Sequence, residues 1–171
     1  MYRKLLGLLK RNKISYKEIE HKTVYTAFDL AKTTGIDLKE IAKTLLIKAD
    51  GQFVLVVLPG HRNLDLTAFK KFLNHYYKSN LKKNKQKFSA IKTIKICTET
   101  QIKRNLTRGQ TINLLPFGWL YGKDLFVDNL LFRNKKITFS AGSFERALRL
   151  AVSNYLKISQ LVRGSFSVSR R

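Results

Sequence analysis

The alternation of apolar and polar positions predicts a chain in which short helices are mixed with hairpin-connected strands. The clearest strands are residues 44–48 and 52–58, which are apolar, rich in β-branched residues and separated by Gly51. Lys43 precedes the first strand, so the pattern places a lysine at the mouth of a buried hairpin. A lysine there is costly unless its ammonium faces a cleft or an anion. We interpret Lys43 as a candidate for chemistry; the alternative is a lysine that snorkels from the strand end.

Helical periodicity and capping residues predict the remaining elements. Thr26 with Asp29, and Thr98 with Gln101, have the spacing of a capping box. Helices are expected over residues 1–12, 26–35, 38–42, from 63 or 65 onward, 98–105 and 144–158, and strands over 15–21, 94–97, 124–132 and 136–139. Because these elements do not alternate as regular βαβ units, the fold class is α+β. We expect one domain over residues 1–160 and a basic, flexible tail over 161–171.

The charge balance indicates a polyanionic partner. The chain has 34 Lys and Arg against 11 Asp and Glu, a formal net charge of +23, whereas a magnitude of about 2–8 is enough for a small domain. The basic residues gather between residues 70 and 95 among Tyr76, Tyr77 and Phe88, a combination that suits phosphate contact and base stacking. An anionic membrane surface, or a lysine-rich proteome with no partner, stays open. The residues predicted to contact the nucleic acid are Lys78, Lys82, Lys83, Lys85 and Lys87.

Several function classes are disfavoured by the residues present. The single cysteine, Cys97, excludes an internal disulfide and fits a reducing cytoplasm. Three histidines and one cysteine are too scattered for a zinc pattern. No apolar run approaches the roughly 20 residues of a membrane helix. No Ser-His-Asp, Cys-His or paired-carboxylate arrangement stands out, and no glycine-rich phosphate loop is found. We therefore expect no metal, no cofactor and no membrane partner.

A series of short motifs runs in order along most of the chain. It consists of Ile19-Glu20-His21, Thr26-Ala27, Ile41-Ala42-Lys43-Thr44-Leu45-Leu46, Val56-Val57-Leu58-Pro59-Gly60, Leu64-Asp65, Pro116-Phe117-Gly118, Val127-Asp128 and Ala141-Gly142. In order and spacing this series resembles the YbaK/ProX family of aminoacyl-tRNA deacylases. That family is similar to the editing insertion domain of bacterial prolyl-tRNA synthetase.

The resemblance implies a trans-acting enzyme that hydrolyses the ester of a mischarged tRNA without a metal or a covalent intermediate. It also implies a mixed, mostly antiparallel, barrel-like sheet flanked by helices. Lys43 would anchor the terminal nucleotide and polarise the ester, and a water or the neighbouring ribose hydroxyl would attack. His21 and Thr26 would line the aminoacyl pocket, with Asp128 and Gly142 near the opposite wall. The remaining substrate-binding residues would come from the loop that contains Asn113, Pro116, Phe117 and Gly118. The partner would be aminoacylated tRNA, with an aminoacyl-tRNA synthetase as a further candidate.

One loop departs from the family pattern. The family has a Gly-x-x-x-Pro loop, and counting back from Pro116 places Ile112 where the glycine belongs. Isoleucine does not readily adopt the positive φ that glycine allows, so Asn113 or Gly109 would have to substitute for it. His61 likewise replaces the acidic residue that usually follows Pro-Gly. The alternative functions are a non-catalytic tRNA-binding module of the same fold and, third, an adaptor for an anionic surface or partner. The amino acid, the tRNA and the oligomeric state stay open.

Overall fold

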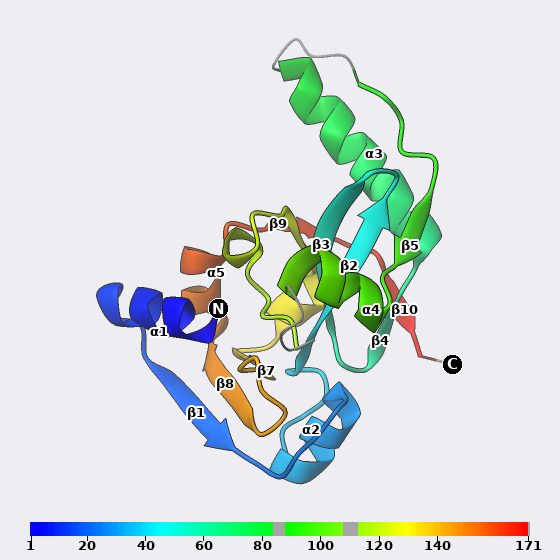
Figure 1. Ribbon diagram of the computed structural model, residues 1–171. Helices are drawn as coiled ribbons and strands as arrows, with labels where there is room; N and C mark the ends of the chain where they lie inside the picture. The colour runs from blue at the N-terminus through cyan, green and yellow to red at the C-terminus, as the bar shows by residue number, and fades with distance from the viewer. Residues whose placement is uncertain (84–87, 108–112, 171) are drawn as a thin grey trace.

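The computed structural model describes residues 1–83, 88–107 and 113–170, with the backbone alone at 81–83 and 107 (Figure 1). The helices are α1 (Tyr2–Arg11), α2 (Ala27–Thr34), α3 (Leu66–Lys83), α4 (Glu99–Ile102) and α5 (Val152–Ser159), with a π-helical turn η1 (Lys103–Thr107) and two 3₁₀ turns, η2 (Gly118–Leu120) and η3 (Asn129–Arg133). The strands are β1 (Tyr16–Glu20), β2 (Ala42–Ala49), β3 (Gln52–Pro59), β4 (Arg62–Leu64), β5 (Ile94–Ile96), β6 (Leu125–Asp128), β7 (Lys136–Ser140), β8 (Arg146–Ala151), β9 (Val162–Gly164) and β10 (Ser167–Ser169).

In the described ranges these strands form three sheets. The central sheet has the order β5-β2-β3-β6-β9, a second sheet has the order β1-β8-β7, and β10 pairs with β4 in a two-stranded ribbon. β6 lies parallel to β3 and to β9, and the other strand pairs are antiparallel. The prediction of a single α+β domain with a mixed, mostly antiparallel sheet is therefore confirmed. The barrel-like arrangement is wrong, because β5 and β9 end the central sheet without pairing with each other.

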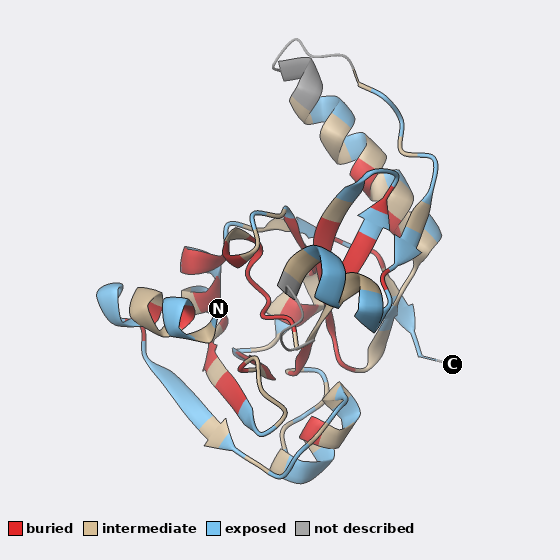
Figure 2. Ribbon diagram, viewed as in Figure 1, coloured by how far each residue is buried: buried red, intermediate tan, exposed pale blue. Residues whose placement is uncertain are grey.

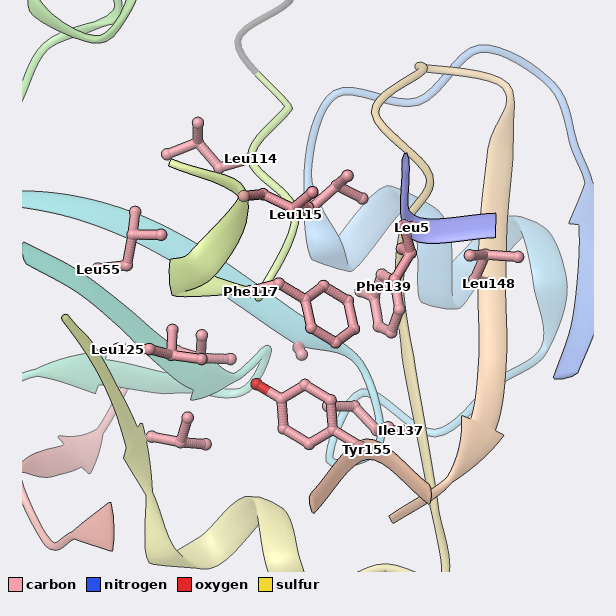
Figure 3. Packing of buried hydrophobic residues seen from close by; sticks show 14 of the residues in the cluster. Leu5, Leu55, Leu114, Leu115, Phe117, Leu125, Ile137, Phe139, Leu148 and Tyr155 are labelled. Carbon is pink, nitrogen blue, oxygen red and sulfur yellow. The ribbon is translucent and has the colours of Figure 1, made fainter. Parts of the chain in front are cut away.

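Apolar side chains pack on both faces of the central sheet, whose middle strands are buried along most of their length (Figure 2). On one face, Leu55 of β3 belongs to a cluster with Leu5, Phe117 and Tyr155, which come from distant parts of the chain (Figure 3). The other face is covered by α3, whose Phe69 is fully buried in a second cluster. The central sheet is thus the middle layer, and α2 packs against β1 and β8 of the second sheet through a third, smaller cluster.

The antiparallel hairpin and the first helices form where the sequence pattern predicts them. β2 and β3 pair from Lys43 opposite Leu58 to Ala49 opposite Gln52, with the turn between them. Thr26 and Thr98 both make the predicted capping boxes. The predicted helix 38–42 is instead a turn, since the Asp37 Oδ1 accepts a hydrogen bond from the Lys39 amide at 2.8 Å. The chain then enters β2 at Ala42.

The C-terminal third differs most from the prediction. The expected helix 144–158 begins as β8, which pairs with both β1 and β7, so tertiary pairing overrides the local helical pattern. The expected strand 124–132 ends at Asp128, whose side chain caps η3. The tail expected to be flexible forms β9 and β10, with Phe166 buried between them. Residues 162–169 therefore pack as part of the fold.

Candidate functional site

An open cavity of about 330 Å³ lies at the start of β2, between α2 and α4. Four of the residues predicted to form the site contribute to its wall, namely His21, Thr26, Lys43 and Asn113. The fold brings them together from positions that are far apart in the sequence. A second cavity of about 320 Å³ borders the β2–β3 turn and holds none of the predicted site residues.

α2 holds Thr26 in the cavity wall. The Thr26 Oγ1 accepts a hydrogen bond from the Asp29 amide at 3.1 Å and donates one to the Asp29 carboxylate at 2.7 Å. Gly35 ends the helix with a φ of 70°, a conformation that glycine adopts without strain. Because its hydroxyl is already engaged in the cap, Thr26 shapes the wall of the cavity.

A partly buried ion pair fixes the entry of β2. The Glu40 carboxylate accepts hydrogen bonds from Arg149 Nε at 2.6 Å and Nη2 at 2.8 Å, and a third from Thr138 Oγ1 at 2.9 Å. Burial acts to raise the pKa of Glu40, but the hydrogen bonds from Arg149 and Thr138 hold that pKa below its ordinary value. This bidentate pair ties the segment before Lys43 to the β1-β8-β7 sheet.

Lys43 is half-buried in the second position of β2. Burial, followed by the positive charge of Arg170, lowers the pKa of its ammonium group. In the described parts of the chain no salt bridge reaches Lys43. A partly desolvated cation without a salt bridge is suited to an anionic or strongly polar ligand.

Other basic groups lie near Lys43 and near His61, which is itself close to Lys43. Burial lowers the pKa of His61, as do the positive charges of Arg62, Lys39 and Lys43, while Asp37 acts in the opposite direction. Arg62 donates hydrogen bonds to Ser169 Oγ at 2.8 Å and to the Ser167 carbonyl at 3.1 Å, which fixes it to β10. We call this group the cationic rim; its members are Lys39, Lys43, His61, Arg62 and Arg170.

Two residues of the cavity wall carry buried polar atoms that have no hydrogen-bond partner in the described structure. They are the Nε2 of His21 and the Oγ1 of Thr44. The His21 backbone amide donates to the Glu145 carbonyl at 3.0 Å, and the ring Nδ1 lies 2.8 Å from the Lys22 carbonyl. Burying a polar atom without a partner costs about 1–3 kcal/mol, so these two atoms lower the stability of the folded protein.

The Pro-Phe-Gly segment is buried away from the cavity. Phe117 is fully buried and packs edge-on against Phe139 and Tyr155 (Figure 3). The Tyr155 hydroxyl donates to the Pro116 carbonyl at 2.8 Å. A Cβ on Gly118 would lie 2.2 Å from the Lys123 carbonyl oxygen, so glycine is required there for close backbone packing. The observed contacts of these three residues are structural, and the structure does not bring them to the cavity.

Asp128 and Gly142 also lie outside the cavity lining. Asp128 is 1% exposed, and its carboxylate accepts hydrogen bonds from the Leu130 and Phe166 amides, both at 3.0 Å. Gly142 has a φ of 76° in the turn between β7 and β8, close in sequence to Ser140, which does line the cavity. Asp128 therefore holds the C-terminal segment in place, and Gly142 makes a turn beside the wall.

The structure describes the side chains of only some of the lysines predicted to bind tRNA. Lys78 is exposed on α3. The side chains of Lys82 and Lys83, and the whole of Lys85 and Lys87, lie outside the described residues, as do Gly109 and Ile112. Their predicted roles stay predictions.

The sequence pattern did not single out Tyr25, Thr44 or Glu99, which line the cavity as well. Thr44 directly follows Lys43 in the motif at residues 41–46. That position is the sequence signal by which Thr44 could be recognised as a residue of the cavity wall. Glu99 opens α4 after the Thr98 cap. Its helix could be predicted, but its place in the wall of the same cavity as Lys43 depends on the packing of distant elements.

The described part of the chain contains no group of three or more His, Cys, Asp or Glu side chains that could hold a metal ion. None of its helices is both long and apolar enough to span a bilayer.

Comparison with known proteins identifies the family. Residues 21–158 match the family model of the aminoacyl-tRNA editing domain, and the chain belongs to this family. The relationship predicted from the ordered motifs is thereby confirmed.

The curated relatives include proline–tRNA ligases of Staphylococcus aureus. The ligase of strain bovine RF122 / ET3-1 is 34% identical over 58 residues, which cover 34% of this chain and 10% of the ligase. For strain Newman the match is 34% over 56 residues, covering 33% of this chain and 10% of the ligase. The matched segment is thus a small part of each ligase.

Solved structures share the fold. The hypothetical protein APE2540 superposes with a TM-score of 0.77 at 18% identity, covering 96% of this chain and 99% of that protein. A protein provisionally described as a trans-editing enzyme for prolyl tRNA synthetase has a TM-score of 0.71 at 16% identity, covering 98% and 97%. At these identities the likeness shows the fold alone.

Proposed function

We propose that this protein is a trans-acting aminoacyl-tRNA deacylase, which hydrolyses the ester between a wrongly attached amino acid and the 3′ end of a tRNA. The observation that carries the proposal is the half-buried Lys43, which makes no salt bridge in the described chain, in the wall of a cavity of about 330 Å³ in an editing domain. The cavity would take the aminoacyl group, and the cationic rim would take the phosphate of the terminal nucleotide.

The chemistry requires little beyond positioning. An aminoacyl ester is already activated, so donors aimed at the developing oxyanion and a well-placed attacking group account for the catalysis. Lys43 supplies up to three N–H donors toward the ester region. A water, or the neighbouring ribose hydroxyl, attacks the carbonyl carbon. His21 and Thr26 form the wall against which the acyl group is held.

The net charge of the whole chain supports the same partner. A formal charge of +23 attracts a polyanion over a long range and speeds its encounter with the protein. We infer that aminoacylated tRNA is the partner, that an aminoacyl-tRNA synthetase produces the mischarged substrate, and that the protein works in the cytoplasm, where tRNAs are charged.

A panel of mischarged tRNAs tests the proposal. We expect the wild type to release the amino acid from at least one member. We expect Lys43→Ala to slow that release by about 100-fold or more, the cost of one lost donor to an oxyanion. Lys48→Ala is the matched control, because Lys48 is exposed on the same strand. The control should retain wild-type activity, and Lys43→Ala should still bind tRNA.

Two other outcomes would contradict the enzyme proposal. If the wild type hydrolyses no member of the panel but binds tRNA with a steep dependence on salt, the protein is a non-catalytic tRNA-binding module of the same fold. If the binding is absent or insensitive to salt, both functions are wrong.

A further inference from the structure

Tyr25 is the most exposed of the large apolar and aromatic residues in the described chain, with 73% of its surface accessible. A single exposed aromatic residue is ordinary on a protein surface. Tyr25, however, also lines the cavity that contains Lys43, and no other Phe, Tyr or Trp lines it among the described residues. Since most of the other lining residues are buried or half-buried, Tyr25 lies at the open mouth of the cavity.

Contacts with the rest of the fold hold Tyr25 in this position. The amide of Val24 donates to the Phe144 carbonyl at 2.9 Å, and the amide of Thr26 donates to the Asp29 carboxylate at 3.2 Å. The centroid of the Phe144 ring lies 5.0 Å from that of the Tyr25 ring, at an interplanar angle of 52°. Tyr25 stays 73% exposed despite this contact. Its ring is therefore accessible to a ligand and has little conformational freedom to lose on binding.

We propose that Tyr25 is a stacking platform for the unpaired base of the nucleotide that carries the ester, the 3′-terminal nucleotide of the tRNA. This inference rests on the proposed deacylase function and adds a residue that positions the substrate. When the ester lies at Lys43 and the acyl group occupies the cavity, the ribose and its base are the parts of the substrate next to the mouth. Every base has a π-face, so an aromatic ring can stack on it without reading the sequence.

The nearby charges favour a nucleotide as the occupant. Lys43 lines the same cavity as Tyr25, and Arg170 of the cationic rim is close enough to Lys43 to lower its pKa. Positive groups near an exposed aromatic ring are the combination that binds single-stranded nucleic acid. An apolar protein segment on Tyr25 would leave these charges unpaired, whereas a stacked nucleotide brings its own phosphate to them.

The fluorescence of an uncharged RNA tests the stacking without any ester chemistry. The probe is a hairpin RNA with an unpaired 3′ CCA end in which 2-aminopurine replaces the terminal adenine, because stacking on an aromatic ring quenches this base. We expect the wild type and Tyr25→Phe to quench the fluorescence on binding. Tyr25→Leu keeps an apolar side chain but has no π-face, so it should leave the base fluorescent. Tyr16→Ala is the control, because Tyr16 is exposed on β1 and does not line the cavity.

A second RNA measures how much the base contributes to binding. It is the same hairpin with a terminal ribose that lacks its base. Tyr25→Ala should bind the complete hairpin about 5- to 150-fold more weakly than the wild type does, which corresponds to one stacked base. The two proteins should bind the hairpin without the terminal base equally, because the interaction is then already absent. Circular dichroism verifies that each variant folds.

The possible results separate this inference from the function beneath it. If the wild type binds the hairpin without quenching the terminal base, or if Tyr25→Ala weakens the binding of both hairpins equally, the inference is wrong and the deacylase function stands. Unchanged affinity of Tyr25→Ala for both hairpins would also contradict the inference and would leave the exposed ring to a protein partner. If no mischarged tRNA is hydrolysed but the terminal base is quenched, the deacylase function fails and the platform belongs to a tRNA-binding module. If neither hairpin binds, both fail.

Discussion

Lys43 and Thr44 are adjacent at the start of β2, and each has a polar side-chain group that the described residues leave unpaired. Lys43 has no salt bridge there, and the Thr44 hydroxyl has no hydrogen bond. Such groups lower the stability of the unliganded protein and are typical of sites that bind a ligand. The cost at Lys43 can be measured directly.

Replacing Lys43 by methionine should stabilise the protein at pH 7. The pKa of Lys43 is lowered from its ordinary value of 10.5 by burial and by Arg170. Below this lowered pKa the folded state holds an ammonium that is better solvated in the unfolded chain, so the charge opposes folding. Lys43→Met removes this cost while keeping a stem of similar length. Urea unfolding at pH 7 should therefore give a higher free energy of unfolding for the variant.

The pH dependence distinguishes this cause from a change in packing. As the pH rises from the lowered folded pKa towards 10.5, the folded wild type loses its proton first and regains stability. The advantage of Lys43→Met should shrink over this window. A Lys43→Met variant that is less stable than the wild type at pH 7 would show that the ammonium makes a stabilising contact. Lys48→Met, on the exposed part of β2, serves as the control.

The sequence predicts single site residues well only where local signals fix them. Lys43 could be predicted because a charged residue interrupts the start of an apolar hairpin, and Thr26 because its cap depends on residues within one helical turn. Pro116, Phe117 and Gly118 had the form of a ligand-binding turn. Their burial comes from contacts with Tyr155 and Lys123, and a local pattern cannot show these contacts.

At the scale of elements, the C-terminal strands show how distant contacts decide structure. β9 and β10 are three residues each and have little periodicity of their own. β9 forms by pairing with β6, and β10 by pairing with β4. For the same reason β8 could not be predicted from its helical pattern, since β1 and β7 flank it. The β2–β3 hairpin, whose partners are adjacent in sequence, was predicted correctly.

Asp128 should be essential for holding this C-terminal segment. Its buried carboxylate accepts the Phe166 and Leu130 amides, and Asp128→Ala would leave both donors unpaired. We expect the free energy of unfolding to fall by about 3 kcal/mol, given the cost of buried unpaired donors. Hydrogen exchange should accelerate at residues 162–169 more than in α3.

Asp128→Asn is the matched variant, because it keeps one side-chain oxygen as an acceptor and should lose less stability. Equal exchange in residues 162–169 for Asp128→Ala and the wild type would contradict this role. In that case the pairing of β9 with β6 and of β10 with β4 would be sufficient to hold the segment.

At the scale of the whole molecule, the two-stranded ribbon of β4 and β10 helps to determine where positive charge gathers. β4 and β10 bring Arg62 and Arg170 to the cationic rim, while the chain as a whole carries a formal charge of +23. β4 and β10 pair at the edge of the molecule (Figure 1). A polyanion attracted by the overall charge would be oriented by the rim, with its end directed to the cavity.

Replacing Arg170 by alanine tests whether the rim contacts the backbone of the bound tRNA. If Arg170 neutralises one phosphate, the variant should bind tRNA more weakly, and the slope of log K against log salt should decrease by about one. Lys78→Ala, on exposed α3, tests the predicted basic surface in the same assay. Lys17→Ala, exposed on β1, is the control for the loss of one positive charge.

The same Arg170→Ala variant tests whether tRNA binding and the protonation of Lys43 are connected. Because the charge of Arg170 lowers the pKa of Lys43, its removal should raise that pKa, which leaves Lys43 more fully protonated. We therefore expect a higher KM for mischarged tRNA with little change in kcat at neutral pH. An unchanged salt slope with an unchanged KM would mean that the substrate approaches the cavity from another side, across α2 or α4. Arg170 would then act on Lys43 alone, by lowering the pKa of its ammonium group.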